Sequence, residues 1–120
     1  MNSLLAVQLV GVGGALGALL RYGAYAALPT DEYPFATLLV NVLGSFLLGV
    51  VTFGGAGEGA ALFVGVGVCG AFTTYSSFSV DVVRLWERGR PTHAAVHAVG
   101  NLALSLLAVG VAWLLVELVV

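Results

Sequence analysis

The chain has 120 residues, of which 60% are hydrophobic and 8% are charged, with six acidic and four basic side chains. A water-soluble domain carries about 25% charged residues, so this composition excludes an ordinary soluble protein and indicates one that spans a lipid bilayer. Nucleic-acid binding is disfavoured because the sequence has no basic patch, and the single cysteine, Cys69, rules out an internal disulfide.

Four apolar segments follow one another, separated by short polar or glycine-rich stretches. Each segment is long enough to cross about 30 Å of hydrocarbon as a helix that rises about 1.5 Å per residue. Lipid offers no partners to backbone groups, so segments of this kind must be helical. We therefore expect an all-α membrane protein with a single domain over residues 1–120, whose four transmembrane helices lie at about 4–28, 35–54, 60–86 and 94–118.

The basic residues gather toward one end of this expected bundle. Short loops force successive spans to alternate in direction, so the loops at 29–34 and 87–93 share one side of the membrane. The positive-inside rule places these loops in the cytoplasm and both termini outside. The basic residues at this end are Arg21, Arg84, Arg88 and Arg90.

Neutral polar side chains recur on the second and fourth spans at helical spacing. Thr37, Asn41 and Ser45 lie four residues apart in the second span, and Asn101 and Ser105 do so in the fourth. Residues at this spacing share one face of a helix. Hydrogen bonds within or between helices are a sufficient explanation of any single group. With the cluster in the third span, the set favours the lining of a pore or substrate site.

The densest polar cluster is GAFTTYSSFS, residues 70–79 of the third span. Helical spacing predicts that Thr73, Ser76 and Ser77 share one face, beside an aromatic stripe that includes Tyr75 and Phe78.

The first residues of this cluster also bear on the course of the helix. Glycine followed closely by a pair of threonines is poor helix-forming material in mid-span. Two alternatives stay open: a continuous helix in which Gly70 is a packing residue, and a broken helix whose carbonyls face a cavity or a bound cation.

The polar groups expected inside the membrane are uncharged. A cation path usually carries a ring of acidic residues, and a proton relay carries a buried carboxylate. The nearest candidates, Asp81 and Glu117, are expected at span ends. Amides and hydroxyls donate hydrogen bonds and aromatic ring edges are positive, so the lining favours an anion or a neutral solute.

Other chemical classes have little support in the sequence. His93 and His97 are four residues apart, a spacing that suits a metal, but no further ligand completes a site and we expect both at the membrane interface. Neither a nucleophile with its base nor a phosphate-binding loop is present, so the protein is not expected to be an enzyme.

Three motifs, in order, resemble the CrcB/Fluc family of fluoride channels over nearly the whole chain. GGALGALLRYG (13–23) is similar to the first-span motif of the family, with its arginine at Arg21. TLLVNVLGSFLLG (37–49) is similar to the second-span motif, with its pore asparagine at Asn41. GAFTTYSSFS (70–79) is similar to the third-span break.

The resemblance implies a fluoride-specific channel subunit in the cell membrane that exports fluoride passively and so lowers its cytoplasmic concentration. It implies an antiparallel dimer of the dual-topology type. It also implies a structural Na⁺, not transported, held at the dimer centre by the backbone carbonyls of Gly70 and Thr73. The pore-lining residues implied by the resemblance or by the polar pattern are Thr37, Asn41, Tyr75, Ser76, Ser77, Phe78, Asn101 and Ser105.

The chain departs from the family pattern in two places and in its charge. Tyr75 stands where the family usually has phenylalanine, and Asn101 stands where tyrosine is common. An antiparallel homodimer requires a chain that inserts both ways, whereas the arginines here favour one orientation. Our hypothesis is therefore a heterodimer with an oppositely oriented homologue. Two rival functions are a small multidrug-type exporter, which needs a membrane-embedded carboxylate, and a non-conducting assembly subunit.

Overall fold

The computed structural model describes residues 1–29 and 31–120; Thr30, part of the first predicted loop, lies outside the described residues. The described chain forms four helical rods long and apolar enough to cross a membrane, which confirms the predicted all-helical, four-span architecture. The first, second and fourth rods are α1 (Ser3–Ala27), α2 (Phe35–Phe53) and α6 (Pro91–Val119). The third rod is built from α3 (Glu58–Ala60), η1 (Ala61–Cys69), α4 (Gly70–Phe72) and α5 (Ser76–Glu87).

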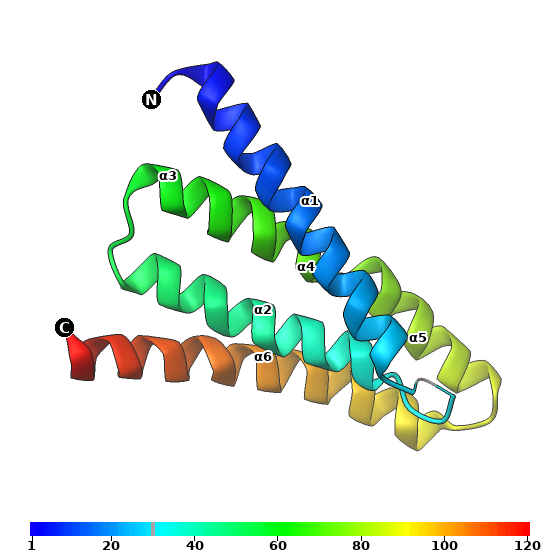
Figure 1. Cartoon of the computed structure of the whole chain (residues 1–120). Coiled ribbons are helices and arrows are strands. Elements are labelled where there is room, and N and C mark those ends of the chain that lie inside the picture. Colours follow the sequence, from blue (N-terminus) through cyan, green and yellow to red (C-terminus); the bar gives the residue numbers. More distant parts are fainter. Residues whose placement is uncertain (30) are drawn as a thin grey trace.

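Both polar loops lie at one end of the bundle, and both termini lie at the other (Figure 1). Arg88 Nη1 donates to the carbonyl of Asp31 at 3.2 Å, and Arg90 Nη1 donates to the carbonyl of Glu32 at 3.3 Å. At the opposite end, the N-terminal ammonium lies 3.8 Å from the Glu58 carboxylate. The spans therefore alternate in direction, as the short loops predict.

The third rod is interrupted near its middle. Regular helix ends at Phe72 and resumes at Ser76, and Thr73 adopts an extended conformation with φ −79° and ψ 159°. Of the two alternatives for this segment, the broken helix is confirmed. Before the break, η1 is a π-helix, a wider form of helix that the residue pattern does not predict.

The rods pack as two pairs, with α1 against η1 and α2 against α6 (Figure 1). Gly13 and Gly17 are buried in the first pair. A Cβ atom at Gly17 would overlap the carbonyl oxygen of Val68, and one at Gly13 would overlap that of Phe63. Such close backbone approach drives helix association in lipid and admits only glycine at these positions. The arrangement holds α1 against the half of the third rod that precedes the break.

Candidate pore groove and its polar end

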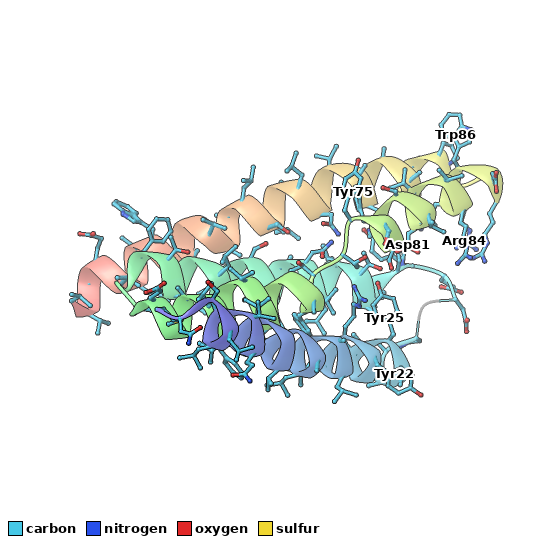
Figure 2. All side chains as sticks on the ribbon, turned by 90° about the horizontal axis from the view of Figure 1, so that it is seen from above. Tyr22, Tyr25, Tyr75, Asp81, Arg84 and Trp86 are labelled. Carbon is cyan, nitrogen blue, oxygen red and sulfur yellow. The ribbon has the colours of Figure 1, made fainter. Side chains whose placement is uncertain are left out.

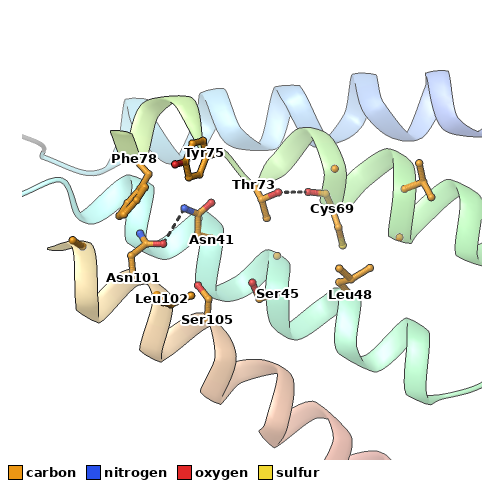
Figure 3. Close-up of a pocket in the computed structure, with 15 residues that line it drawn as sticks. Asn41, Ser45, Leu48, Cys69, Thr73, Tyr75, Phe78, Asn101, Leu102 and Ser105 are labelled. Atoms are coloured by element: carbon orange, nitrogen blue, oxygen red, sulfur yellow. Dashed lines mark hydrogen bonds between the residues drawn. The ribbon is translucent and has the colours of Figure 1, made fainter. Parts of the chain in front are cut away.

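An open groove of about 630 Å³ is lined by α2, both halves of the interrupted rod and α6 (Figure 3). The groove brings together residues that the sequence places on three different spans. The predicted site residues that line it are Asn41, Gly70, Thr73, Tyr75, Phe78, Asn101 and Ser105.

The Asn41 side chain bridges the break. Its Nδ2 donates to the carbonyl of Thr74 at 3.0 Å and to Oδ1 of Asn101 at 3.1 Å, and its Oδ1 accepts the N–H of Thr74 at 2.8 Å. In a continuous helix that N–H would bond to the Gly70 carbonyl one turn earlier. Asn41 therefore replaces a lost helical bond and joins α2 to the break and to α6.

Two of the hydroxyls at the break have local structural roles. Thr73 Oγ1 donates to the carbonyl of Cys69 at 2.9 Å, a bond to its own helix (Figure 3). Thr74 Oγ1 accepts the N–H of Ser77 at 3.1 Å in the first turn of α5. These bonds stabilise the ends of the two half-helices, so a role in a pore is not required to account for either hydroxyl.

The buried side-chain atoms without a hydrogen-bond partner in the described residues lie on α6. Within 1–29 and 31–120, the buried side-chain atoms without a partner are both ring nitrogens of His97, Nδ2 of Asn101 and Oγ of Ser105. His97 is fully buried and Asn101 is 6% exposed. Because the oxygen of Asn101 faces Asn41, its NH₂ group points toward Phe78 (Figure 3). A buried donor without a partner is costly unless a ligand or water meets it.

Three other predicted pore residues lie in smaller cavities nearer the loop end. Ser76 and Ser77 line one of about 280 Å³, and Thr37 lines another of about 160 Å³. Both cavities include Asp81. The expected common face of Thr73, Ser76 and Ser77 is wrong, because helical periodicity does not continue across the break.

Asp81 and His97 also differ from expectation, since both lie inside the bundle. The Asp81 side chain is 18% exposed, and its Oδ2 accepts the Thr37 hydroxyl at 2.6 Å. Thr37 gives its only hydroxyl proton to Asp81, so it accepts from Tyr25 at 2.5 Å. His97 Nε2 lies 3.7 Å from the same carboxylate oxygen. Figure 2 shows Tyr25, Asp81 and Arg84 near the loop end.

Arg21 serves the break more directly than the loop. It lies in the final third of α1, is part-buried, and donates from Nη1 to the carbonyl of Thr73 at 3.3 Å. The guanidinium therefore satisfies a carbonyl that the interruption leaves without its helical partner. The first-span motif singles out Arg21, but the sequence alone does not indicate that its partner is the Thr73 carbonyl.

The comparisons with known proteins agree with these motifs. A family model described as "CrcB-like protein, Camphor Resistance (CrcB)" matches residues 8–113. The chain is 54% identical over 119 residues to fluoride-specific ion channel FluC 2 of Haloarcula marismortui, covering 99% of this chain and 100% of that protein. It is 58% identical over 108 residues to FluC 1 of Halobacterium salinarum, covering 90% and 91%. It is 46% identical over 106 residues to FluC of Thermus thermophilus, covering 82% and 84%. The chain belongs to the CrcB-like family.

Proposed function

We propose that this protein is a subunit of a fluoride-specific channel in the cell membrane and not an enzyme. The relatives named as fluoride-specific ion channels support this function. The structural observation that carries it is the pair of buried, unpartnered donors in the groove, Asn101 Nδ2 and Ser105 Oγ, counted over the described part of the chain. Fluoride is small and holds its water tightly, so a pore must replace that water with close hydrogen-bond donors.

In this mechanism Asn41 positions the donor of Asn101. Because Asn41 donates to Oδ1 of Asn101, the NH₂ group of Asn101 is left for the ion. Phe78 and Tyr75, whose ring centroids are 6.0 Å apart, offer positive ring edges beside it. Once a second subunit closes the groove, a neutral lining of this kind would admit fluoride in preference to the larger chloride. A membrane potential that is negative inside drives the anion outward, so export needs neither ATP nor a coupled ion.

The loop-end cavities would form the cytoplasmic mouth of the path. Ser76 and Ser77 contribute hydroxyl groups there. Thr37 lines the same region with its proton given to Asp81, and Arg84 lines both cavities. A cationic side chain at a pore mouth raises the local concentration of anions. The orientation with these loops in the cytoplasm follows from the arginines at this end.

An antiparallel dimer would close the groove. Tyr75 is 81% exposed although it lines the groove, and Gly70 is also exposed, so this face suits contact with a second subunit in the bilayer. The loop end carries Arg84, Arg88 and Arg90, so a partner of opposite orientation is best supplied by a homologue with the reverse bias.

The carbonyl oxygens at the break fit a structural Na⁺ at the centre of such a dimer. The Gly70 carbonyl is released from helical bonding because Asn41 takes the N–H of Thr74. The Thr73 carbonyl has a second lone pair beside the one used by Arg21. Together the two carbonyls would hold the ion with their counterparts in the second subunit, and the ion would stabilise the assembly without being transported.

The sodium proposal predicts selective stabilisation of the assembled protein. A ligand that binds only the folded state raises its melting temperature as the ligand concentration rises. Melting curves in detergent should therefore shift upward with NaCl, and fluoride efflux should fall when sodium is replaced by N-methylglucamine. Equal stabilisation by NaCl and KCl would contradict a sodium site.

Fluoride flux from liposomes tests the proposed function itself. The chain is reconstituted alone and with a homologous subunit, and efflux is followed with a fluoride electrode after the potassium ionophore valinomycin is added. We expect rapid fluoride efflux with the partner and little without it, with chloride retained in both cases. Full-sized efflux from the chain alone would refute the heterodimer.

The same assay separates the two rival functions. A non-conducting assembly subunit predicts no flux in either sample. An exporter driven by protons predicts fluoride efflux only when a pH gradient is applied. Asp81 supplies the internal carboxylate that such a protein needs. The names of the relatives favour the channel over both rivals.

A further inference from the structure

The predicted pore residues fall into two groups that line separate cavities. One group lines the large groove, and the other lines the loop-end cavities around Asp81. His97 lies between them. Its ring centroid is 5.3 Å from that of Phe78 in the groove, and its Nε2 is 3.7 Å from the Asp81 carboxylate.

His97 continues the row of unpartnered donors on α6. His97, Asn101 and Ser105 are each four residues apart, so they lie on one face, about 6 Å apart along the axis. Each contributes a buried nitrogen or oxygen that has no hydrogen-bond partner in residues 1–29 and 31–120. The row runs from the groove toward the start of α6 at Pro91, which is the loop end.

Two aromatic rings flank His97, and the Asp81 carboxylate lies 3.7 Å from its Nε2, beyond hydrogen-bond distance. Phe78 lies against one side of the ring and Tyr33 meets it edge-on, with centroids 5.4 Å apart. A leucine would fill this space without leaving ring nitrogens unsatisfied, since replacing an unpaired buried polar group by an apolar one of similar shape is neutral or stabilising. Asp81 is too distant to accept a hydrogen bond from the ring, so a ring N–H of His97 is free to donate to a ligand.

We infer that His97 is a further permeation residue, which donates a ring N–H to fluoride as the ion passes between the groove and the loop-end cavities. This inference rests on the proposed channel function. Asn101 and Ser105 hold the ion in the groove, and His97 receives it one helical turn closer to the loops. The Asp81 carboxylate beside His97 opposes an anion, and the hydrogen bond from Thr37 and the nearby Arg84 offset part of that charge. Binding of the ion at His97 is therefore weak and brief, as conduction requires.

The test compares fluoride efflux and thermal stability for wild type, H97L and H97Q in the form of the protein that conducts. H97L removes the donor and keeps the bulk of the side chain, whereas H97Q keeps an N–H donor at similar reach. We expect H97L to slow efflux about tenfold or more, on the scale of one hydrogen bond to a charged group, with an unchanged or higher melting temperature. H97Q should fall between H97L and wild type.

The matched control is H93L, the same change one turn earlier on α6 at an exposed position, which should conduct as wild type does. Efflux from H97L at the wild-type rate would overturn the inference. Equal slowing in H97L and H97Q together with lower melting temperatures would overturn it in favour of a structural role. If the proposed channel function is wrong, the wild-type protein itself will show no fluoride efflux, which separates that outcome from a failure of the role of His97.

Discussion

Replacing Asn41 by aspartate is expected to lower fluoride efflux by about 100-fold or more. The change removes both amide donors, which bond the Thr74 carbonyl and Oδ1 of Asn101. Asn101 would then turn its NH₂ group toward the new carboxylate, so the groove loses the donor offered to the ion. The added charge also opposes the ion, because two like charges about 4 Å apart cost about 4 kcal/mol at an effective dielectric constant of about 20.

The measurement is the fluoride-electrode assay on liposomes, with the amount of assembled protein checked by size-exclusion chromatography. The matched control is N2D, at the position that caps the start of α1. There the side-chain oxygen of Asn2 accepts the N–H of Leu4 at 2.8 Å, and an aspartate accepts it equally well. N2D should therefore conduct normally. Normal efflux from correctly assembled N41D would remove Asn41 from the mechanism.

The largest effect on stability is expected from Gly17→Ala. The added Cβ would overlap the carbonyl oxygen of Val68, which is part of the backbone and cannot rotate away. Helix α1 would have to withdraw from η1, at a cost of about 3 kcal/mol, the upper part of the usual range for overpacking. Withdrawal of α1 would also pull Arg21 from the Thr73 carbonyl, so fluoride efflux should fall as well.

Thermal unfolding in detergent, followed by circular dichroism, measures this effect. Gly11→Ala is the matched control, because it lies on the same helix and a Cβ there meets no described atom within 4 Å. Alanine favours a helix over glycine by up to about 1 kcal/mol, so the control should melt at the same temperature or higher. Equal melting of the two variants would show that the close approach of α1 and η1 does not limit stability.

The span architecture was predictable from the sequence because lipid imposes a simple requirement. Every backbone group must be satisfied within its own helix, so length and hydropathy suffice to place four rods. The break was partly predictable as well. Gly70 and the pair Thr73–Thr74 signal weak helix in mid-span, and the structure interrupts the rod after Phe72.

The inward position of Asp81 could not be predicted in the same way, whereas the four-residue spacing of His97 from Asn101 already puts His97 on the polar face of the fourth span. Arguments from helical faces assume about 100° per residue, and neither η1 nor the break keeps that angle. The rotation of α5 about its axis relative to the first half of the rod therefore cannot be predicted from the sequence. The direction in which the Asp81 side chain points cannot be predicted either. The pairing of Asn41 with Asn101 depends on how α2 packs against α6, which only the tertiary structure specifies.

The glycines of this chain meet two different physical constraints. At Gly13 and Gly17 the chain's own backbone leaves no room for a side chain, so folding alone requires glycine there. At Gly70 a Cβ would meet no described atom within 4 Å. A single subunit is therefore indifferent to a larger residue at this position. Mutational tolerance at Gly70 reports on what surrounds the subunit in its assembled state, and not on whether the subunit folds.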